Sequence, residues 1–242
     1  MSPRVLSPVL TGPLLRFRSV ESTQDVAREL ARRTGGGASG RLPRHLLTVC
    51  AGYQTRGRGR LGRRWLAERD QALLLSMAFL YGEPEEPSRL ALFAALAACR
   101  TAEALAGRPA ALKWPNDVVM EGRKLGGVLV ETSPAEAGRL AVVGVGINVS
   151  RRPLPGAACL GEFGAGAGVE EVLERFLADY DRVLGCEAGR ALAAVVERLS
   201  LPPEVTDADG RRLAVSGAGA GFFVARGAGC VRQVPFHRVL DW

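Results

Sequence analysis

Apolar residues occur along the chain both as continuous runs and at helical spacing, and this pattern predicts strands and helices in mixed order. Residues 46–50, 72–80 and 140–149 are nearly continuous apolar runs, which are typical of buried strands. Shorter β-type runs occupy 111–114, 118–120 and 127–132. Between the last two, the turn residues Glu121-Gly122-Arg123 predict a hairpin.

Three segments have the features of helices. One begins near Ser22-Thr23, whose hydroxyls suit an N-cap, and stops before the glycines at 35–37. A second runs from Pro87 to about Ala106 and ends at Gly107. A third is the amphipathic stretch 169–184. Residues 1–16 have three prolines and no clear period, which predicts a loosely held lead-in. The whole order predicts an α+β domain, with flanking helices on one mixed sheet.

The pattern changes near residue 200, which predicts a second module. A turn at 207–210 is followed by short β-type segments at 213–215, 222–225, 231–234 and Val239, separated by Gly-rich turns. Short strands of this kind predict a small β-barrel that leans on its neighbour. We therefore assign residues 1–195 to a main domain and 196–242 to a C-terminal β-module.

Composition narrows the possible functions. The chain has 242 residues, of which 47% are apolar, so it can form one packed domain with a small appendage. A net charge of +7 indicates anionic ligands or partners, or simply a solvated, arginine-rich surface. No apolar run approaches the ~20 residues of a membrane span, and the N-terminus lacks the features of a secretory signal. Five scattered cysteines without a C-x-x-C pair fit reduced thiols in the cytoplasm, and two isolated histidines argue for no metal site.

The most informative segment is residues 54–65, QTRGRGRLGRRW. Its three glycines permit unusual backbone angles and close approach to a ligand, and its five arginines supply guanidinium donors. Trp65 can stack on a purine or cap the site. Such a loop fits a polyanion such as ATP, and it equally fits nucleic acid, so the loop alone does not choose between them.

Two further segments carry polar groups at predicted strand ends. Residues 113–117, KWPND, place a lysine, an amide and a carboxylate together, and Lys124 follows just before two glycines. These charges suit a triphosphate and a carboxyl group under attack, or belong to a solvated hairpin. Residues 144–148, GVGIN, lack the third glycine of a dinucleotide fingerprint, and instead predict a strand end that lines a pocket, with Asn148 offering a polar edge. Residues 22–25, STQD, taken alone, fit a helix cap.

Together these segments resemble, in order along roughly residues 17–150, the biotin protein ligases (biotin–[acetyl-CoA-carboxylase] ligases). The segment 123–131, RKLGGVLVE, belongs to the same match. The resemblance implies the catalytic fold shared with lipoate ligases and class II aminoacyl-tRNA synthetases, followed by a C-terminal SH3-like β-barrel. No helix-turn-helix domain fits before Phe17, so we expect the monofunctional type without the N-terminal DNA-binding domain.

The resemblance also implies roles for individual residues. Gln24 stands where the family often has Asn. The implied catalytic residues are Arg58, Lys113, Asp117 and Lys124. The implied biotin-binding residues are Ser22, Thr23, Gln24, Gln54, Arg58, Gly59, Arg60, Lys124, Gly126 and Gly127. The implied nucleotide-binding residues are Gly57, Arg58, Arg60, Arg63, Trp65, Asn116, Lys124 and Asn148. No residue is assigned to a metal.

The activity that the resemblance implies is a two-step ligation with ATP and Mg²⁺. Biotin is activated as biotinyl-5′-AMP and then transferred to a lysine of a biotin carboxyl carrier protein or domain of an acyl-CoA carboxylase. We expect a monomer or homodimer that binds neither DNA nor membrane. One alternative is a lipoate or octanoate ligase or transferase of the same superfamily, although an acyltransferase needs a reactive Cys opposite a Lys, and these motifs contain no Cys. The other is a basic nucleic-acid-binding module, for which Trp65 is the only aromatic residue within the basic run.

Overall fold

The structure is a computed structural model, and it describes residues 9–34, 43–82, 87–136, 138–200, 204–206, 211–219, 222–227 and 230–235. Its centre is an eight-stranded sheet in the order β1-β2-β3-β7-β6-β5-β4-β8. The strands are β1 (Leu14–Phe17), β2 (Arg44–Ala51), β3 (Ala72–Tyr81), β4 (Ala110–Lys113), β5 (Asp117–Met120), β6 (Arg123–Ala135), β7 (Gly138–Asn148) and β8 (Leu199–Ser200). Only the edge pairs β1/β2 and β4/β8 are parallel, and the other neighbours in this sheet are antiparallel.

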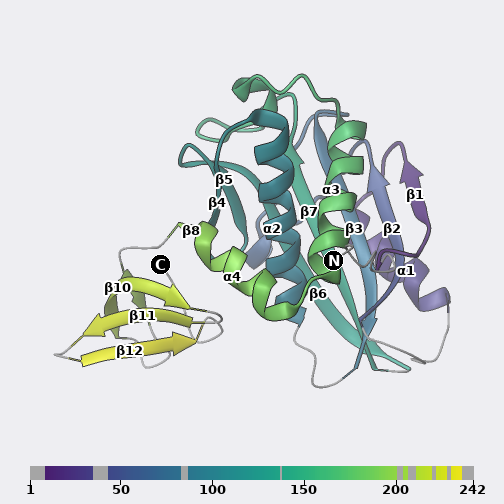
Figure 1. Cartoon of the computed structure of the whole chain (residues 1–242). Coiled ribbons are helices and arrows are strands. Elements are labelled where there is room, and N and C mark those ends of the chain that lie inside the picture. The colour runs from purple at the N-terminus through teal and green to yellow at the C-terminus, as the bar shows by residue number, and fades with distance from the viewer. Residues whose placement is uncertain are drawn as a thin grey trace, which may run out of the picture.

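Helices cover the two faces of this sheet unequally (Figure 1). On one face lie α2 (Pro87–Ala106), α3 (Val169–Gly185) and α4 (Ala188–Arg198), with the 3₁₀ turn η2 (Leu160–Phe163). They enclose the larger core, in which Phe79 of β3 packs with Phe176 and Tyr180 of α3. The other face carries α1 (Thr23–Arg33), whose Ala27 and Ala31 form a small second core against β2 and β7. The predicted α+β architecture is therefore confirmed.

The face shared with α1 is hollow beyond the N-terminus of that helix, because several strand positions there, mainly on β7, carry small or polar residues. Side chains alternate between faces along a strand, so one face of three adjacent strands is set by every second residue. On β7 these are Gly144, Gly146 and Asn148, and they are paired on β3 and β6 with Ser76 and Gly127, among others. Glycine and serine occupy little volume, so the sequence of these strands leaves space for a ligand.

The end of one helix and the turn of one hairpin are confirmed in the main domain. Gly107 ends α2 with φ of 64°. Glu121 and Gly122, with φ of 49° and 72°, form the two-residue turn between β5 and β6. The strand β6 starts at Arg123, four residues before the predicted start at 127. The register of the ladder between β5 and β6 shifts at Leu125, which is fully buried. This shift and the glycines at 126–127 interrupt the strand pattern, so the sequence did not indicate the true start of β6.

Several elements were not predicted. The expected lead-in at 1–16 is wrong for Leu14–Phe17, which pair in parallel with β2. A four-residue strand is too short to show a period, and its hydrogen bonds come from a segment more than thirty residues away. Helix α4 was also missed, although its buried Ala191 and Val195 lie at helical spacing. The short strands β8 and β9 (Glu204–Thr206) were missed as well.

The C-terminal residues form a separate antiparallel sheet in the order β12-β11-β10-β9. Its strands β10 (Arg212–Gly219), β11 (Phe222–Gly227) and β12 (Cys230–Pro235) confirm the β segments predicted at 213–215, 222–225 and 231–234. The predicted turn at 207–210 and the segment at Val239 lie outside the described residues. Closure into a barrel stays a prediction. Among the helices described, none is long and apolar enough to span a membrane.

Candidate functional site

A cavity of about 660 Å³ occupies the hollow face of the main sheet. Its walls are the N-terminus of α1, the loop 54–65, the turn between β4 and β5, and the paired strands β6 and β7. The structure brings most of the residues implied by the resemblance to this one cavity. They are Ser22, Thr23, Gln24, Gln54, Arg58, Gly59, Arg60, Arg63, Trp65, Lys113, Asn116, Asp117, Lys124, Gly127 and Asn148.

Two residues of the implied set, Gly57 and Gly126, do not line this cavity. Gly57 lies in an adjoining groove on the outer side of the loop. A Cβ atom at Gly57 would stand 2.6 Å from the carbonyl oxygen of Trp65, and one at Gly126 would stand 2.7 Å from that of Gly146. Both glycines therefore shape the site by allowing close approach of backbones.

The start of α1 presents hydroxyl groups to the cavity. Ser22 holds the N-cap position, yet its side chain makes no capping hydrogen bond. The next residue, Thr23, donates its backbone N–H (2.8 Å) and its hydroxyl (3.0 Å) to Oε1 of Gln54, and its Oγ1 lies 2.8 Å from Oγ of Ser76. The interpretation of this segment as a simple helix cap therefore fails for Ser22, whose hydroxyl stays available to a ligand.

Gln24 is buried beside these hydroxyls. Its Nε2 donates to the carbonyl oxygen of Leu129 (3.2 Å), which fixes the amide. A Cβ atom on Gly144 would stand only 3.1 Å from Cδ of Gln24, so the glycine of β7 makes room for this side chain.

The arginine-glycine loop folds back on itself beside the sheet. The backbone N–H of Trp65 donates to the carbonyl of Gly57 (3.0 Å), and that of Gly59 donates to the carbonyl of Arg63 (2.8 Å). At its tip, the 3₁₀ turn η1 (Arg60–Gly62) places Leu61 at a φ of 55° with 86% of its surface exposed. The loop thus folds into a turn with an exposed apolar tip.

Two contacts connect this loop to the far side of the cavity. Nη1 of Arg60 donates to Oδ1 of Asn116 in the β4–β5 turn (3.2 Å), while Asn116 Nδ2 donates to the carbonyl of Val128 (2.8 Å). The indole of Trp65 lies on Gly146, where an added Cβ would stand 2.5 Å from its Cε2 and Cζ2 atoms. The second glycine of residues 144–148 is thus the floor on which Trp65 rests.

Three charged groups converge at the end of the β4–β5–β6 meander. Lys113 and Asp117 are paired across the β4–β5 hairpin, and Nζ of Lys124 donates to Oδ1 of Asp117 (2.6 Å). The same Nζ lies 5.9 Å from the centroid of the Trp65 ring. Gly127 lies beneath this pair, since its Cβ would stand 3.3 Å from Oδ1 of Asp117. The predicted catalytic groups Lys113, Asp117 and Lys124 are therefore neighbours.

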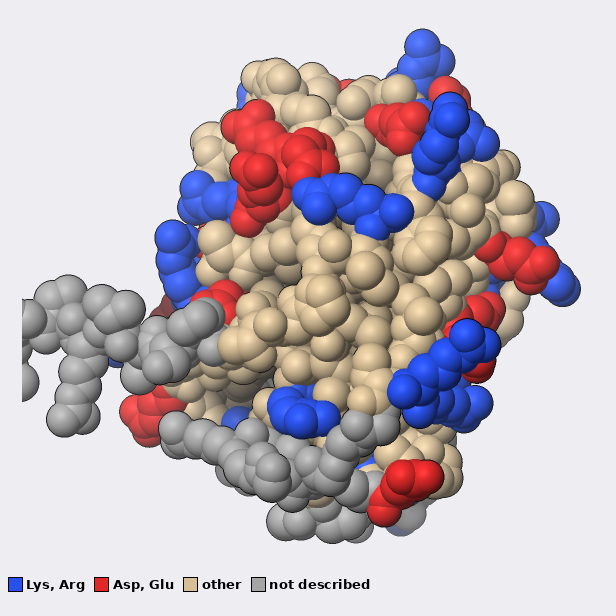
Figure 2. Space-filling model, turned by 90° about the vertical axis from the view of Figure 1, so that its right-hand side faces the viewer, with Lys and Arg blue, Asp and Glu red and all other residues tan. Residues whose placement is uncertain are grey.

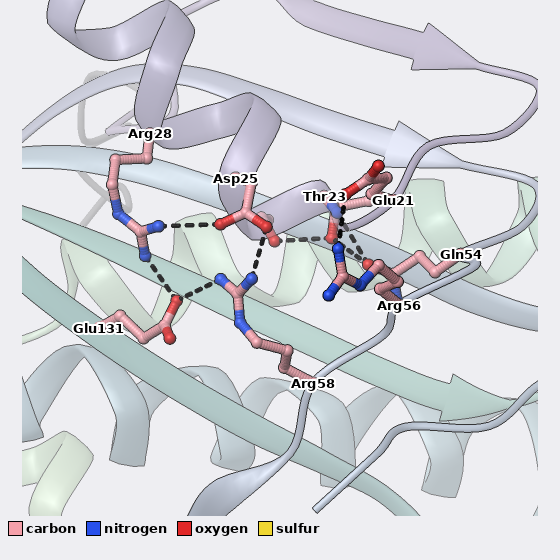
Figure 3. Close-up of polar contacts among 9 residues, drawn as sticks. Glu21, Thr23, Asp25, Arg28, Gln54, Arg56, Arg58 and Glu131 are labelled. Atoms are coloured by element: carbon pink, nitrogen blue, oxygen red, sulfur yellow. Dashed lines mark hydrogen bonds and ion pairs between the residues drawn. The ribbon is translucent and has the colours of Figure 1, made fainter. Parts of the chain in front are cut away.

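Arg58, predicted to bind both biotin and the nucleotide, is held by two carboxylates that were not predicted as site residues (Figure 3). Its Nη1 lies 2.5 Å from Oδ2 of Asp25, and its Nη2 lies 2.9 Å from Oε2 of Glu131. Arg28 contacts the same two carboxylates. The hydrogen bond from Arg58 lowers the pKa of Asp25, and the one to Asp25 raises the pKa of Arg58. No pattern in the sequence pairs a helix with a strand a hundred residues away.

Besides Nε of Arg58, four buried polar atoms of residues that line the cavity have no hydrogen-bond partner within the structure. They are Oγ of Ser22, Oε1 of Gln24, Nε1 of Trp65 and Oδ1 of Asn148. Asn148 is held by its other side-chain atom, because Nδ2 donates to the carbonyl of Ala158 (2.9 Å). Buried polar groups are normally satisfied, so four such atoms around one cavity indicate a ligand with both donors and acceptors.

A further wall of the cavity was missed from the sequence. Pro153, Leu154 and Ala157, in the connection after β7, also line it. The backbone N–H of Ala158 donates to the carbonyl of Lys124 (2.8 Å), which attaches this connection to β6.

Cys50, Cys99, Cys159 and Cys186 are free thiols, and none of these four lines the cavity. Burial raises the pKa of the Cys50 thiol to about 11.

The contacts of the loop arginines and the face drawn in Figure 2 give no support to a nucleic-acid groove. Several arginines of the loop are engaged within the protein, Arg56 by Glu21 and Arg58 by Asp25 and Glu131. On the face shown in Figure 2, basic and acidic side chains alternate around uncharged residues rather than forming one basic stripe. A nucleic-acid-binding surface normally presents a continuous basic patch.

The sequence model of the Biotin/lipoate A/B protein ligase family matches residues 20–148, just over half of the chain. The bifunctional ligase/repressor BirA of Bacillus subtilis is 35% identical over 147 residues, 60% of this chain and 43% of that protein. The biotin--[acetyl-CoA-carboxylase] ligase of Mycobacterium tuberculosis is 38% identical over 112 residues, 44% of this chain and 41% of that protein. The matched part of the chain thus spans about two fifths of the length of these curated relatives.

Solved structures extend the likeness to nearly the whole chain. A biotin protein ligase from Aquifex aeolicus in complex with biotin and ATP superposes with a TM-score of 0.69 at 26% identity, covering 92% of this chain and 95% of that one. The biotin protein ligase of Leishmania major in complex with biotinyl-5-AMP shares the fold, with a TM-score of 0.65 at 21% identity and coverage of 92% and 98%. Since the family model matches more than half of the chain and includes most of the residues that line the cavity, this chain belongs to the biotin/lipoate A/B protein ligase family.

Proposed function

We propose that the chain is an ATP-dependent ligase that activates biotin as biotinyl-5′-AMP and transfers it to a lysine of a biotin carboxyl carrier protein or domain. The observation that carries this proposal is the set of four unpartnered polar atoms on Ser22, Gln24, Trp65 and Asn148. The bicyclic head of biotin has two N–H donors and a carbonyl acceptor, and adenine also carries donors and acceptors. A ligand of this chemistry satisfies such atoms.

The same atoms favour biotin over lipoate or octanoate. An alkyl or dithiolane chain has no group to pair with Oε1 of Gln24 or Oγ of Ser22, which lie together at the start of α1. Leaving a buried polar atom unpaired costs about 1–3 kcal/mol. A thiol-dependent acyltransferase is not supported either, because none of the four free cysteines of the described residues lines the cavity.

In the first step, the carboxylate of biotin attacks the α-phosphorus of ATP and releases pyrophosphate. Negative charge builds on the phosphoryl oxygens, and the cations that line the cavity, Arg58, Arg60, Lys113 and Lys124, are suited to stabilise it. The loop carrying Gly57, Gly59 and Arg63 would cover the phosphates. Trp65 would pack near the adenine, with Asn116 and Asn148 toward the nucleotide.

In the second step, the lysine amine of the carrier attacks the acyl carbon and AMP leaves. An amine must be neutral to attack, and Asp117 is the residue proposed to orient or deprotonate the incoming ammonium. Asp117 already accepts from the ammonium of Lys124 in this structure. A second ammonium arriving at the same carboxylate would therefore find an acceptor of the right charge.

Mg²⁺ is proposed to enter with the phosphates of ATP. Among the described residues, no group of three His, Cys, Asp or Glu side chains is placed to hold a metal, and Asp117 is the one carboxylate that lines the cavity. Mg²⁺ commonly keeps several waters and binds through one or two carboxylates together with substrate phosphates, so this donor set fits it. When bound, the ion would neutralise phosphate charge.

The C-terminal sheet is proposed to belong to an SH3-like module next to the site. Its consecutive strands are antiparallel neighbours, as in a small meander barrel. The division proposed at 195/196 falls within α4, shortly before β8 joins the main sheet. We further propose that the chain acts as a monomer or homodimer on the carrier of an acyl-CoA carboxylase.

The direct test is to incubate the protein with ATP, Mg²⁺ and either biotin, lipoate or octanoate, and to identify the acyl-adenylate by mass. We expect biotinyl-AMP to accumulate and the other two adenylates to be at background. Lipoyl-AMP or octanoyl-AMP formation without biotinyl-AMP would reassign the chain within its family. The matched control is Arg108→Ala, which removes a cation paired with Glu121 outside the cavity.

A further inference from the structure

Four side chains beside the cavity form a closed ring of alternating charge (Figure 3). Arg28 and Asp25 extend from α1, Glu131 from β6 and Arg58 from the loop. Each guanidinium contacts both carboxylates, at 2.5 to 3.0 Å, and Oε2 of Glu131 is shared by the two arginines. We call these four residues the ion ring. Its formal charges, two positive and two negative, sum to zero.

The ring fixes Arg58 while leaving part of it available. Asp25 and Glu131 take one terminal nitrogen each, so the planar guanidinium is held in a single orientation. Its remaining nitrogen, Nε, is buried without a partner, and Arg58 lines both the cavity and the outer groove. A flexible arginine thereby becomes a preoriented donor, which is what stabilisation of developing charge requires.

Holding a cation with two carboxylates creates an electrostatic problem for an anion site. Asp25 and Glu131 with Arg58 alone would carry a net negative charge and repel the phosphates and the carboxylate that the cavity is proposed to bind. Arg28 bridges the same carboxylates and removes this excess. Arg28 and Glu131 are only 22% and 32% exposed, so water screens them less than a typical surface pair.

We propose that Asp25 and Glu131 are positioning residues that orient Arg58 toward the anionic ligand, and that Arg28 balances their charge so that the ligand is not repelled. This inference rests on the proposed function, because it assumes that ATP and a carboxylate bind in the cavity. It assigns different effects to Glu131 and Arg28. Glu131 acts on the rate of adenylation, and Arg28 acts on the affinity for anions.

The test measures the dissociation constant of ATP by calorimetry and the rate constant of adenylation, separately. Arg28→Gln leaves one excess negative charge, so we expect the ATP dissociation constant to rise roughly three- to tenfold, with the rate constant within about twofold. Glu131→Gln is isosteric and leaves one excess positive charge. We expect this variant to lower the ATP dissociation constant by roughly threefold. We expect it also to lower the rate constant of adenylation by about tenfold or more, because Arg58 loses one of the two carboxylates that orient it.

The double variant Arg28→Gln/Glu131→Gln restores neutrality. We expect its ATP dissociation constant to return to within about twofold of wild type while the rate constant stays low. Arg33→Gln is the matched control, because it removes a cation of the same helix that pairs with Glu29 away from the cavity. It should leave both constants unchanged. Thermal unfolding of each variant reports whether the fold is retained.

A ring that only tethers the loop would give a different result. Both single variants would then bind ATP more weakly than wild type, and the double variant would bind ATP no more tightly than either single variant. That outcome, or a wild-type rate constant in Glu131→Gln, would overturn the inference. Failure of wild-type protein to form any adenylate from biotin would instead overturn the proposed function. The two single variants are expected to change the ATP dissociation constant in opposite directions, and this measurement does not require biotin. The two failures are therefore distinguishable.

Discussion

Gly146 illustrates how a single absent side chain controls the site. The Trp65 ring occupies the place where a Cβ atom of residue 146 would lie, at 2.5 Å. Gly146→Ala should therefore displace the indole while leaving the β-sheet paired, because the nearest atoms belong to a side chain and not to the backbone. We expect the Michaelis constant for ATP to rise by roughly tenfold, and Trp fluorescence to report the movement. Gly166→Ala, with no atom within 4 Å, is the control.

Lys124 is the second residue whose substitution gives a sharp expectation. Its ammonium is held between Asp117 and the Trp65 ring. If it stabilises charge mainly in the transition state, Lys124→Ala should slow adenylation by about 100- to 1000-fold, or about 3–4 kcal/mol, with the fold intact. Pyrophosphate release measures this rate. A variant that released pyrophosphate as fast as wild type would remove Lys124 from the catalytic set.

At the residue scale, the motif residues could be placed from the sequence because each segment keeps its chemistry local. Residues 113–117 and Lys124 converge because they lie on consecutive strands of the β4–β5–β6 meander. The partners of Arg58 could not be placed. Asp25 and Glu131 meet it only after α1 and β6 have packed on the same face of the sheet.

The element with the clearest dynamic prediction is the loop 56–63. It has three glycines and an exposed apolar tip at Leu61, and the hydrogen bond from Arg60 to Asn116 connects it across the cavity. Few buried contacts hold it, so it belongs among the less stable segments. We expect biotin with ATP to protect its arginines from trypsin, as seen by mass of the fragments. Equal cleavage with and without both substrates would exclude the loop as a lid.

Strand β2 contains a histidine that should make stability depend on pH. Nδ1 of His45 accepts from the backbone N–H of Gly12 (3.0 Å), so Nε2 carries the proton and contacts Thr48 (3.0 Å). Burial lowers the pKa of His45 to about 4. The folded state thus favours the neutral ring, and its contribution is complete above pH about 6.5 and declines as pH falls toward 4.

The size of this effect is bounded by the change in pKa. At most about 3 kcal/mol of unfolding free energy should be lost between pH 6.5 and 4 through His45. His45→Gln should flatten that part of the profile, measured by urea unfolding at a series of pH values. The slope is decisive, since the substitution also changes the stability at neutral pH. An unchanged slope would show that the ring does not titrate in this range.

Helices and strands were predicted correctly where the segment was long and residues typical of element ends flanked it. Helix α2 begins at Pro87 and ends before Gly107, as its terminal residues indicate. It failed for β1 and β9, which are short strands stabilised by pairing rather than by their own sequence. The start of β6 was misplaced because a register shift opposite Leu125 breaks the period of two.

For the molecule as a whole, the unequal covering of the sheet explains why the site lies where it does. Three helices fill one face, and the single helix α1 leaves the other partly open (Figure 1). Gly144, Gly146 and Ser76 leave space on this face, and Leu74 and Leu129 beside them give the cavity apolar walls. The cavity is therefore a consequence of strand composition.

The central claim is that this cavity joins biotin to a protein lysine through an adenylate. The most direct measurement is the intact mass of a biotin carboxyl carrier domain after incubation with the protein, ATP, Mg²⁺ and an equimolar mixture of biotin, lipoate and octanoate. We predict addition of one biotinyl group at the acceptor lysine, and none on a carrier with that lysine changed to arginine. A carrier that gains a lipoyl or octanoyl group, or remains unmodified while a known biotin ligase modifies it, would contradict the account.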